Sequence, residues 1–294
     1  MSISFLRDWA EVLQYQEPLA PYTYLRLGGP AQVIMQPRTA EELSKVVERC
    51  RHERFPVRLL GGGCNLLVRD EGVPGLVLRL TSPAFTTVTV EGLAVKAGGG
   101  ASLSALLSEA ARHSLAGLES LIGIPGSVGG SLRCQAGART GNINQSLRRL
   151  EVLTSAGHIV TYERDDIPLE QLTSGPEELL VLSAEFGLEE DHPEMILKRM
   201  RKYWIDRKAH QPLSFQATAR LFRDEQGLPA EDLISQAGAQ QTQVGGVRLS
   251  ERNPNYVLAE KGATARDVLR LVEMVRSQVH TQLGQELQVG LVIW

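Results

Sequence analysis

The sequence predicts an α+β fold with two or three domains, and three observations support this prediction. Short runs of alternating apolar residues, separated by glycine-containing turns, are typical of antiparallel strands in hairpins. Amphipathic stretches with cap residues at their ends indicate helices between and after these strands. At 294 residues the chain is long enough for more than one hydrophobic core. Strands and helices are therefore expected to gather into separate lobes along the chain.

The first lobe is predicted to be small and βαβ-like. Residues 39–42, Thr-Ala-Glu-Glu, form a capping box. Apolar residues follow at the i, i+3, i+4 and i+7 spacing of a helix, at Leu43, Val46, Val47 and Cys50. Pro56 limits this helix on its C-terminal side. Residues 55–60 then predict a buried strand, and residues 76–78 predict a second strand.

From residue 86 onward the pattern becomes antiparallel. Residues 88–90 and 93–97 alternate on either side of a Glu-Gly turn, which predicts a hairpin. Ser102 is placed to cap a helix whose apolar face carries Leu103, Leu106, Leu107 and Ala110. Residues 150–153 and 159–162 predict a second hairpin, and residues 179–186 predict a further strand of the same sheet.

A basic helix is predicted between residues 194 and 210. Its cationic residues are Lys198, Arg199, Arg201, Lys202, Arg207 and Lys208. Such a helix can contact nucleic acid, but an apolar stripe at Ile196, Met200 and Tyr203 favours a solvated charged face. We expect it to bridge into the last domain and to bind no nucleic acid.

The last domain is predicted from two helices and a closing strand. Pro229 opens a helix that ends at Gly238. Thr264 caps a long amphipathic helix that ends at Gly284. Residues 287–293 alternate between apolar and other residues, which predicts a strand at the end of the chain.

Two glycine-rich stretches are the candidate binding elements. Residues 117–141 read GLESLIGIPGSVGGSLRCQAGARTG, and residues 61–68 read GGGCNLLV after a predicted strand. Glycine lets the main chain pass against a flat or phosphorylated ligand, and successive N–H groups can hold a diphosphate. The second stretch is neither a P-loop nor a dinucleotide fingerprint, because no Gly-Lys-Ser/Thr and no correctly spaced helix follow it. We favour a cofactor cradle over a purely structural turn.

Composition excludes several classes of function. A net charge of −3 argues against a general polyanion binder. Three cysteines fit a reducing compartment better than a disulfide scaffold, and six scattered histidines predict no metal site. The first residues do not resemble a signal peptide, and no apolar run approaches the ~20 residues that a membrane span needs. We expect a cytoplasmic protein without a membrane span.

Four segments together resemble a known family. They read LGGPA at 27–31, LLGGGCNLLV at 59–68, AGGGASLSAL at 97–106 and GLESLIGIPGSVGGS at 117–131. In this order they resemble the MurB family, the UDP-N-acetylenolpyruvoylglucosamine reductases of peptidoglycan synthesis. Residues 244–275 are similar to the third domain of that family. The resemblance implies an N-terminal helix over 1–20, a two-lobed FAD-binding region over 21–190 with lobes near 21–82 and 83–190, and a C-terminal substrate-type domain over 191–294.

The resemblance also implies which residues hold FAD. In the first glycine stretch these are Gly61, Gly62, Gly63, Cys64, Asn65 and Leu66. In the second they are Gly123, Ile124, Pro125, Gly126, Ser127, Gly129, Gly130, Ala136 and Gly137. Cys64 stands where the family commonly has serine, and its thiol is a weaker donor than a hydroxyl. A weakened phosphate contact and a small buried residue without a ligand role both remain open for Cys64.

The family's chemistry depends on three further features that the sequence does not match. The resemblance implies NADPH as the reductant, a serine as proton donor, a glutamate near the C-terminus, and an arginine after a tyrosine in the second lobe. The serine position is held by Arg220 and the glutamate position by Gly290. Residues 166–179, DIPLEQLTSGPEEL, contain neither tyrosine nor arginine. Arg220 and Asn255 are the substrate-side candidates, and Thr218 or Ser214 is a replacement donor only after a shift of register.

Three functions therefore stay open. The first is an NADPH-dependent reductase of UDP-N-acetylenolpyruvoylglucosamine that works with altered groups. The second is a catalytically silent paralogue that binds FAD or a nucleotide-sugar, with a regulatory or structural role, and the residues favour this one. The third is a structural partner of cell-wall enzymes that binds no ligand.

Overall fold

The computed structural model describes residues 3–138, 141–174, 179–212, 217–224 and 228–294. Its contacts divide the chain into two compact units. Unit 1 comprises Met1–Tyr15, Gln32–Gly62 and Pro74–Ile205, and unit 2 comprises Gln16–Ala31, Gly63–Val73 and Asp206–Trp294. The division differs from the predicted boundary near residue 190, because two segments of the N-terminal half pack with the C-terminal part of the chain.

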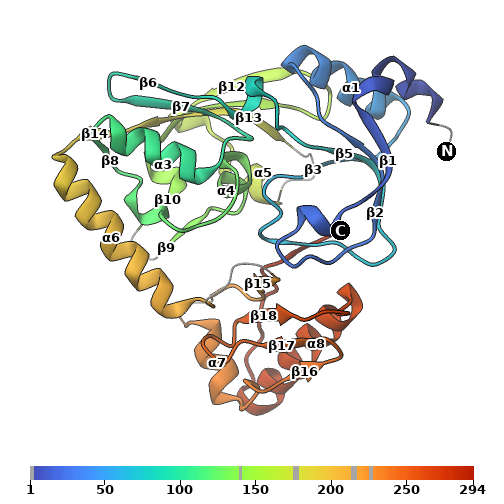
Figure 1. Cartoon of the computed structure of the whole chain (residues 1–294), viewed down its shortest axis with the longest axis vertical. Helices are drawn as coiled ribbons and strands as arrows, with labels where there is room; N and C mark the ends of the chain where they lie inside the picture. Colours follow the sequence, from blue (N-terminus) through green and yellow to red (C-terminus); the bar gives the residue numbers. More distant parts are fainter. Residues whose placement is uncertain (1–2, 139–140, 175–178, 213–216, 225–227) are drawn as a thin grey trace. The chain divides into compact units, whose positions relative to one another are not determined.

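A four-stranded sheet in the order β1-β2-β5-β3 forms the first lobe (Figure 1). Its strands are β1 (Leu13–Pro18), β2 (Pro30–Met35), β5 (Val73–Leu78) and β3 (Val57–Leu59). Helix α1 (Ala40–His52) buries the predicted apolar stripe against this sheet, and Thr39 accepts the N–H of Glu42 as its cap. β3 and β5 are parallel, but residues 60–72 between them contain β4 and no helix, so this pair does not test the predicted βαβ-like arrangement.

The predicted helix over 1–20 is wrong in its second half. The N-terminal turn is a 3-10 helix, η1 (Ser4–Val12), with non-helical backbone angles at Trp9. The chain then extends into β1, where Leu13 is buried and four of the six residues are exposed. Edge pairing with β2 decides this conformation, and such tertiary pairing overrides local helix propensity.

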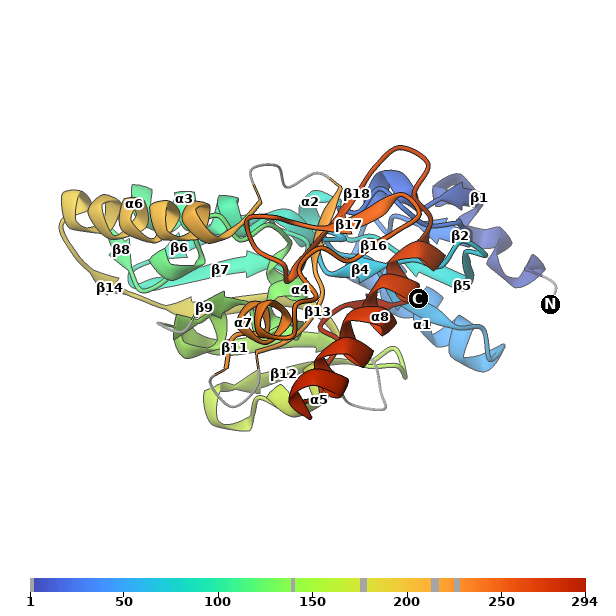
Figure 2. The ribbon, with the colours of Figure 1, turned by 90° about the horizontal axis from the view of Figure 1, so that it is seen from below.

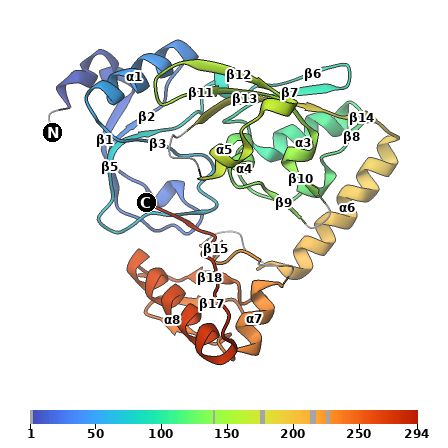
Figure 3. The same cartoon turned by 180° about the vertical axis from the view of Figure 1, so that it is seen from behind.

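A five-stranded antiparallel sheet forms the second lobe, in the order β12-β11-β13-β7-β6. It contains both predicted hairpins, β6 (Val88–Glu91) with β7 (Ala94–Gly98) and β11 (Leu147–Leu153) with β12 (Ile159–Glu163), together with β13 (Leu180–Gly187). Helices α3 (Leu103–Arg112), α4 (Val128–Arg133) and α5 (Leu169–Ser174) lie on one side of this sheet (Figure 3). Ser102 caps α3 through the N–H of Ala105, as predicted.

Short elements connect these layers in unit 1. They are α2 (Pro83–Thr86), β8 (Leu115–Ala116), η3 (Glu119–Leu121), β9 (Gly137–Ala138), β10 (Gly141–Asn142), η4 (Ile143–Ser146), η5 (Arg164–Asp166) and β14 (Glu189–Glu190). Helix α6 (Pro193–His210) follows β14 as one long helix (Figure 2). Ile196 is buried and Met200 packs against the core of the second lobe, so the predicted apolar stripe is confirmed at these positions.

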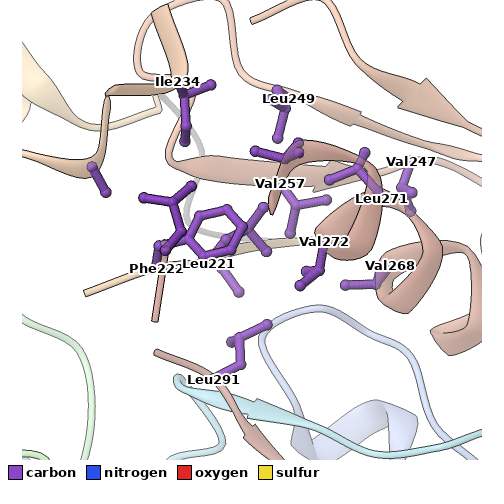
Figure 4. Close-up of a cluster of buried hydrophobic side chains, with 14 of the residues drawn as sticks. Leu221, Phe222, Ile234, Val247, Leu249, Val257, Val268, Leu271, Val272 and Leu291 are labelled. Atoms are coloured by element: carbon purple, nitrogen blue, oxygen red, sulfur yellow. The ribbon is translucent and has the colours of Figure 1, made fainter. Parts of the chain in front are cut away.

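Unit 2 is built on a four-stranded sheet in the order β15-β18-β17-β16. The strands are β15 (Thr218–Arg220), β18 (Tyr256–Ala259), β17 (Val247–Leu249) and β16 (Gln243–Val244). Helices α7 (Ala230–Gln236) and α8 (Ala265–Leu283) begin and end where the sequence predicts, and α8 has a full capping box at Thr264 and a left-handed Gly284. The core between helices and sheet is aliphatic, with Phe222 as its large aromatic side chain (Figure 4).

The remaining parts of unit 2 are η2 (Ala20–Tyr22), β4 (Leu66–Leu67) and β19 (Val292–Ile293). The predicted strand over 287–293 is wrong, because only β19 is a strand and it pairs with β4 in parallel. Leu287 and Leu291 are both buried, while Val289 forms an isolated bridge with Phe222. The chain changes its pairing partner at Gly290, and this change interrupts a single strand.

No helix within the described residues is both long enough and apolar enough to cross a membrane.

Candidate functional site

Three glycine segments of unit 1 line a pocket of about 230 Å³. Gly61 and Gly62 follow β3, Gly99 and Gly100 follow β7, and Gly126 to Gly130 lead into α4. The other described residues at the pocket are Leu59, Leu60, Arg79, Leu80, Thr81, Ser102, Ser127, Arg133, Leu179 and Val181. The pocket brings together six of the predicted cofactor residues, Gly61, Gly62, Gly126, Ser127, Gly129 and Gly130.

Close approach explains why glycine occupies these positions. A Cβ at Gly61 would lie 2.7 Å from the Oγ of Ser127, and a Cβ at Gly129 would lie 3.0 Å from the carbonyl oxygen of Gly99. At Gly100 a Cβ would collide with the carbonyl of Leu80. Side chains are excluded where the segments meet, so main chain forms much of the pocket wall.

The second glycine stretch is partly helical rather than an open cradle. Ser127 caps α4, and its Oγ accepts the N–H of Gly130 at 3.2 Å. The N–H groups of Val128 and Gly129 donate to the carbonyl oxygens of Ala101 and Gly99, each at 2.8 Å. These bonds fix the stretch to the connection between β7 and α3. They also mean that these two N–H groups already have acceptors within the protein.

Two arginines line the pocket that the sequence alone does not predict as site residues. Arg79 follows β5 and Arg133 is the last residue of α4. An isolated arginine in a strand end or a short helix carries no local signal, because only the fold brings the two segments to one pocket. Gly99 and Gly100 also line the pocket; they lie in the AGGGASLSAL segment, whose resemblance to the family does not by itself predict them as site residues. Cationic side chains beside glycine main chain suit an anionic ligand such as a diphosphate.

The remaining predicted cofactor residues lie elsewhere. Residues 63–66 belong to unit 2, where the carbonyl of Gly63 accepts the N–H of Tyr24 at 3.0 Å and the Nδ2 of Asn65 donates to the carbonyl of Gly290 at 2.8 Å. Burial, with Cys64 as a further cause, raises the pKa of Tyr24 to about 12. The turn after η3 contains three more predicted cofactor residues, Gly123, Ile124 and Pro125. The last two predicted cofactor residues are Ala136 and Gly137, at the start of β9.

An ion pair between the buried Glu119 and the partly exposed Arg199 anchors the start of the second glycine stretch. The carboxylate of Glu119 is 9% exposed and accepts bonds from Nε and Nη2 of Arg199 at 2.9 and 2.7 Å. The same carboxylate accepts the N–H of Gly117 at 2.7 Å. Arg199 also pairs with Asp191 at 2.6 Å, and this contact lowers the pKa of Asp191 below its usual value. Glu119 therefore ties α6 to the segment that enters the pocket.

In unit 2 the candidate chemistry lies on β15 and the residues beside it. Arg220 is opposite Tyr256 in the register of β15 and β18. Its Nη2 donates to Asp224 at 2.6 Å, and the same Asp224 oxygen accepts the N–H of Ala230 at the start of α7. Burial raises the pKa of Tyr256, whereas Arg220, Gln211 and Arg207 oppose that shift.

Gly290 lies against the strand that carries Arg220. Its N–H donates to the carbonyl of Leu221 at 2.7 Å, and a Cβ at this position would lie 3.3 Å from the carbonyl carbon of Phe222. Asn255, the second substrate-side candidate, is fully buried. Its amide accepts the N–H of Phe222 at 2.9 Å and donates to the carbonyl of Phe222 at 3.0 Å. These bonds commit Asn255 to holding the chain after β15.

Comparison with known proteins identifies the family. Residues 31–163 match the FAD binding domain family, and residues 211–294 match the C-terminal domain of UDP-N-acetylenolpyruvoylglucosamine reductase. The chain is 32% identical over 290 residues to the UDP-N-acetylenolpyruvoylglucosamine reductase of Rhodopirellula baltica, which covers 99% of this chain and 95% of that protein. The chain belongs to the MurB family.

Further comparisons agree with this family. UDP-N-acetylenolpyruvoylglucosamine reductase 2 of Symbiobacterium thermophilum is 36% identical over 99% of this chain and 94% of its own length. The crystal structure of MurB from Thermus caldophilus superimposes with a TM-score of 0.80 at 33% identity, covering 96% of this chain and 98% of that one. A solvent-stable cholesterol oxidase matches 61% of this chain and 38% of its own at 19% identity and a TM-score of 0.50, which shows a shared fold only. The predicted α+β MurB-like fold is thus confirmed.

The structure describes one of the two alternative proton donors, Thr218 and Ser214. Thr218 lies in β15 and is buried, and its hydroxyl is on the strand that carries Arg220. Ser214 lies outside the described residues. Residues 220 and 290 are arginine and glycine, and no comparison tests whether they are the catalytic positions that the resemblance implies.

Proposed function

We propose that this chain binds FAD in the glycine-lined pocket of unit 1. The observation that carries the proposal is a wall of closely packed main chain with two arginines, inside the segment that matches the FAD binding domain. Backbone at Gly61, Gly62 and Gly126 would lie against the cofactor, and Arg79 and Arg133 would offset its diphosphate charge. When bound, FAD supplies hydride-transfer chemistry.

The first candidate reaction is the NADPH-dependent reduction of UDP-N-acetylenolpyruvoylglucosamine to UDP-N-acetylmuramate, a step in peptidoglycan precursor synthesis. Its support is the match to reductases across nearly the whole chain, at 32–36% identity. In this candidate the chain's own residues must stabilise the negative charge that forms on the substrate and deliver a proton to it.

The second candidate is a catalytically silent paralogue that binds FAD or a nucleotide-sugar and has a regulatory or structural role. Arg220 and Gly290 support this candidate, because they stand where the resemblance implies a serine and a glutamate, and the N–H of Gly290 bonds to the residue after Arg220. A guanidinium stays protonated near neutral pH and cannot act as the acid. A missing general acid lowers the rate by roughly 10²–10⁴, and a missing electrostatic stabiliser by roughly 10²–10³.

Two measurements on the purified protein separate these candidates. Titration with FAD, followed by flavin absorbance after gel filtration, tests the pocket, and an Arg79→Gln, Arg133→Gln double variant should retain less flavin. A protein that never retains FAD would contradict the proposal that the pocket of unit 1 binds FAD. Oxidation of NADPH that depends on UDP-N-acetylenolpyruvoylglucosamine supports the reductase, and bound FAD without such turnover supports the silent paralogue.

A further inference from the structure

Helix α6, drawn in gold in Figure 1, carries apolar side chains on two of its sides. On one side Ile196 is buried and Met200 packs against the core of the second lobe. On another side Leu197, Trp204 and Ile205 remain exposed, with 57%, 47% and 56% of their area open to solvent. All five residues belong to unit 1. A purely charged, solvated face does not account for three large apolar side chains in water.

The helical repeat brings the exposed side chains together around a cation. Leu197, Arg201 and Ile205 follow one another at i, i+4 and i+8, so they form one ridge along the helix. Trp204 is seven residues after Leu197 and three after Arg201, and it therefore lies beside this ridge. Arg201 is also exposed. We call these four residues the outer ridge of α6.

The outer ridge lies in a cationic part of the helix. Lys198, Arg201 and Lys202 are all exposed, and none of the three forms an ion pair with a described residue. The fourth cation of this stretch, Arg199, is instead committed to the ion pairs that anchor α6. The stretch contains one acidic residue, Glu194, in the first turn. Three positive charges therefore remain available to an anionic surface.

Apolar side chains between exposed cations fit a lipid bilayer with anionic headgroups. A helix that lies in the membrane interface places aliphatic side chains among the upper acyl carbons, an indole at headgroup level, and Lys and Arg against the lipid phosphates. Nucleic acid would use the cations, but its phosphate backbone offers no apolar surface to Leu197 and Ile205. A protein partner would need acidic and apolar side chains matched to a convex ridge, whereas a fluid bilayer adapts to it.

We propose that the outer ridge of α6, together with Lys198 and Lys202, docks on an anionic lipid surface. Three apolar side chains are partly buried in the interface, and three cations are attracted to the headgroups. A contact of this size is reversible and does not span the bilayer. None of these residues lines the glycine pocket, so the inference goes beyond the proposed function and does not depend on bound FAD.

Co-sedimentation of the full chain with lipid vesicles tests the docking. The wild type should bind vesicles made of equal parts phosphatidylglycerol and phosphatidylcholine, dissociate as salt rises, and bind pure phosphatidylcholine weakly. Arg201→Gln should weaken binding to the anionic vesicles about fivefold, the effect of one cation near such a surface. Leu197→Gln combined with Ile205→Gln should weaken it about tenfold or more and leave the salt dependence unchanged.

Helix α8 offers matched control variants. Met274 is 52% exposed and Arg270 is exposed on the same helix. Met274→Gln and Arg270→Gln therefore remove an apolar side chain and a cation of the same kinds from another helix surface, and both should bind the anionic vesicles as the wild type does. Circular dichroism of every variant shows whether it folds. If the double glutamine variant does not fold, Leu197→Ala and Arg201→Gln give the same decision.

Each outcome decides the proposal. Wild-type protein that does not bind anionic vesicles, or binding that neither ridge variant weakens, would overturn it. Equal losses in the ridge and control variants would also overturn it, because attraction would then not be located on α6. Binding to a polyglutamate peptide or to single-stranded RNA in place of vesicles, with the same dependence on Arg201, would assign the ridge to an acidic protein or a nucleic acid and reject the lipid surface.

Discussion

Substitution of Gly61 by alanine should destabilise the protein by displacing the Ser127 hydroxyl from its bond to α4. The new Cβ would lie 2.7 Å from the Oγ of Ser127, so the hydroxyl must rotate away. That hydroxyl accepts the N–H of Gly130 and caps α4, and losing such a cap costs about 1 kcal/mol. The Cβ of Ser127 is 3.9 Å from the same point and can stay where it is.

A double-mutant cycle gives this argument a quantitative form. Gly61→Ala and Ser127→Ala should each lower the free energy of unfolding by about 1 kcal/mol, because both remove the same cap. The double variant should be no less stable than Ser127→Ala alone, which gives a coupling energy of about 1 kcal/mol. Urea denaturation of the four proteins measures these values, and FAD titration shows whether the pocket changes with the cap. Additive losses would refute the packing argument.

Three further predictions follow from other parts of the structure. Glu119→Gln should lower the free energy of unfolding by about 1 kcal/mol, since it weakens the charge-assisted bonds to Arg199, which keeps Asp191 as a partner; urea denaturation measures it, and an unchanged free energy of unfolding would contradict it. Tyr24 has its pKa raised to about 12, so its contribution to stability is present below pH 10 and is lost as the pH rises towards 12; Tyr24→Phe should unfold with a weaker pH dependence in that window, and an unchanged dependence would show that Tyr24 is not the group. Arg220→Ser combined with Gly290→Glu should not restore the reductase rate of family members, because the expected tyrosine and arginine of the second lobe are also missing; NADPH oxidation at a full family rate would disprove it.

Local signals determined most of what could be predicted from the sequence. The caps at Thr39, Ser102 and Thr264 and the turn at Gly92 act within a few residues, so the helices and hairpins they predict are confirmed. The strand over 287–293 failed because its alternation is local, whereas its pairing changes from Phe222 to β4. Local pattern cannot reveal such a change of partner.

The candidate pocket was predicted only in part for a related reason. The glycine runs are visible because each needs glycine where segments approach closely, as at Gly61 and Gly129. Arg79 and Arg133 are ordinary surface residue types whose meaning comes from long-range convergence. The α4 helix was missed because glycine disfavours helix locally, while bonds to Gly99 and Ala101 hold it in the fold.

The glycine-lined pocket of unit 1 and the residues around Arg220 in unit 2 differ in how strongly they depend on individual side chains. This difference explains how flavin binding can be retained when turnover is lost. In unit 1 the wall is largely main chain, so many substitutions around it leave its shape intact as long as the close-approach glycines remain. In unit 2 the positions at which the MurB resemblance leads us to expect a serine and a glutamate depend on the identity of single side chains, and Arg220 places a fixed cation at the first of them. Flavin binding and turnover are therefore expected to respond independently: variants that alter the Kd for FAD should include Gly61, and variants that alter turnover without altering that Kd should include Arg220. A mutation at Arg220 that abolished FAD binding while leaving nucleotide-sugar binding unchanged would contradict this separation.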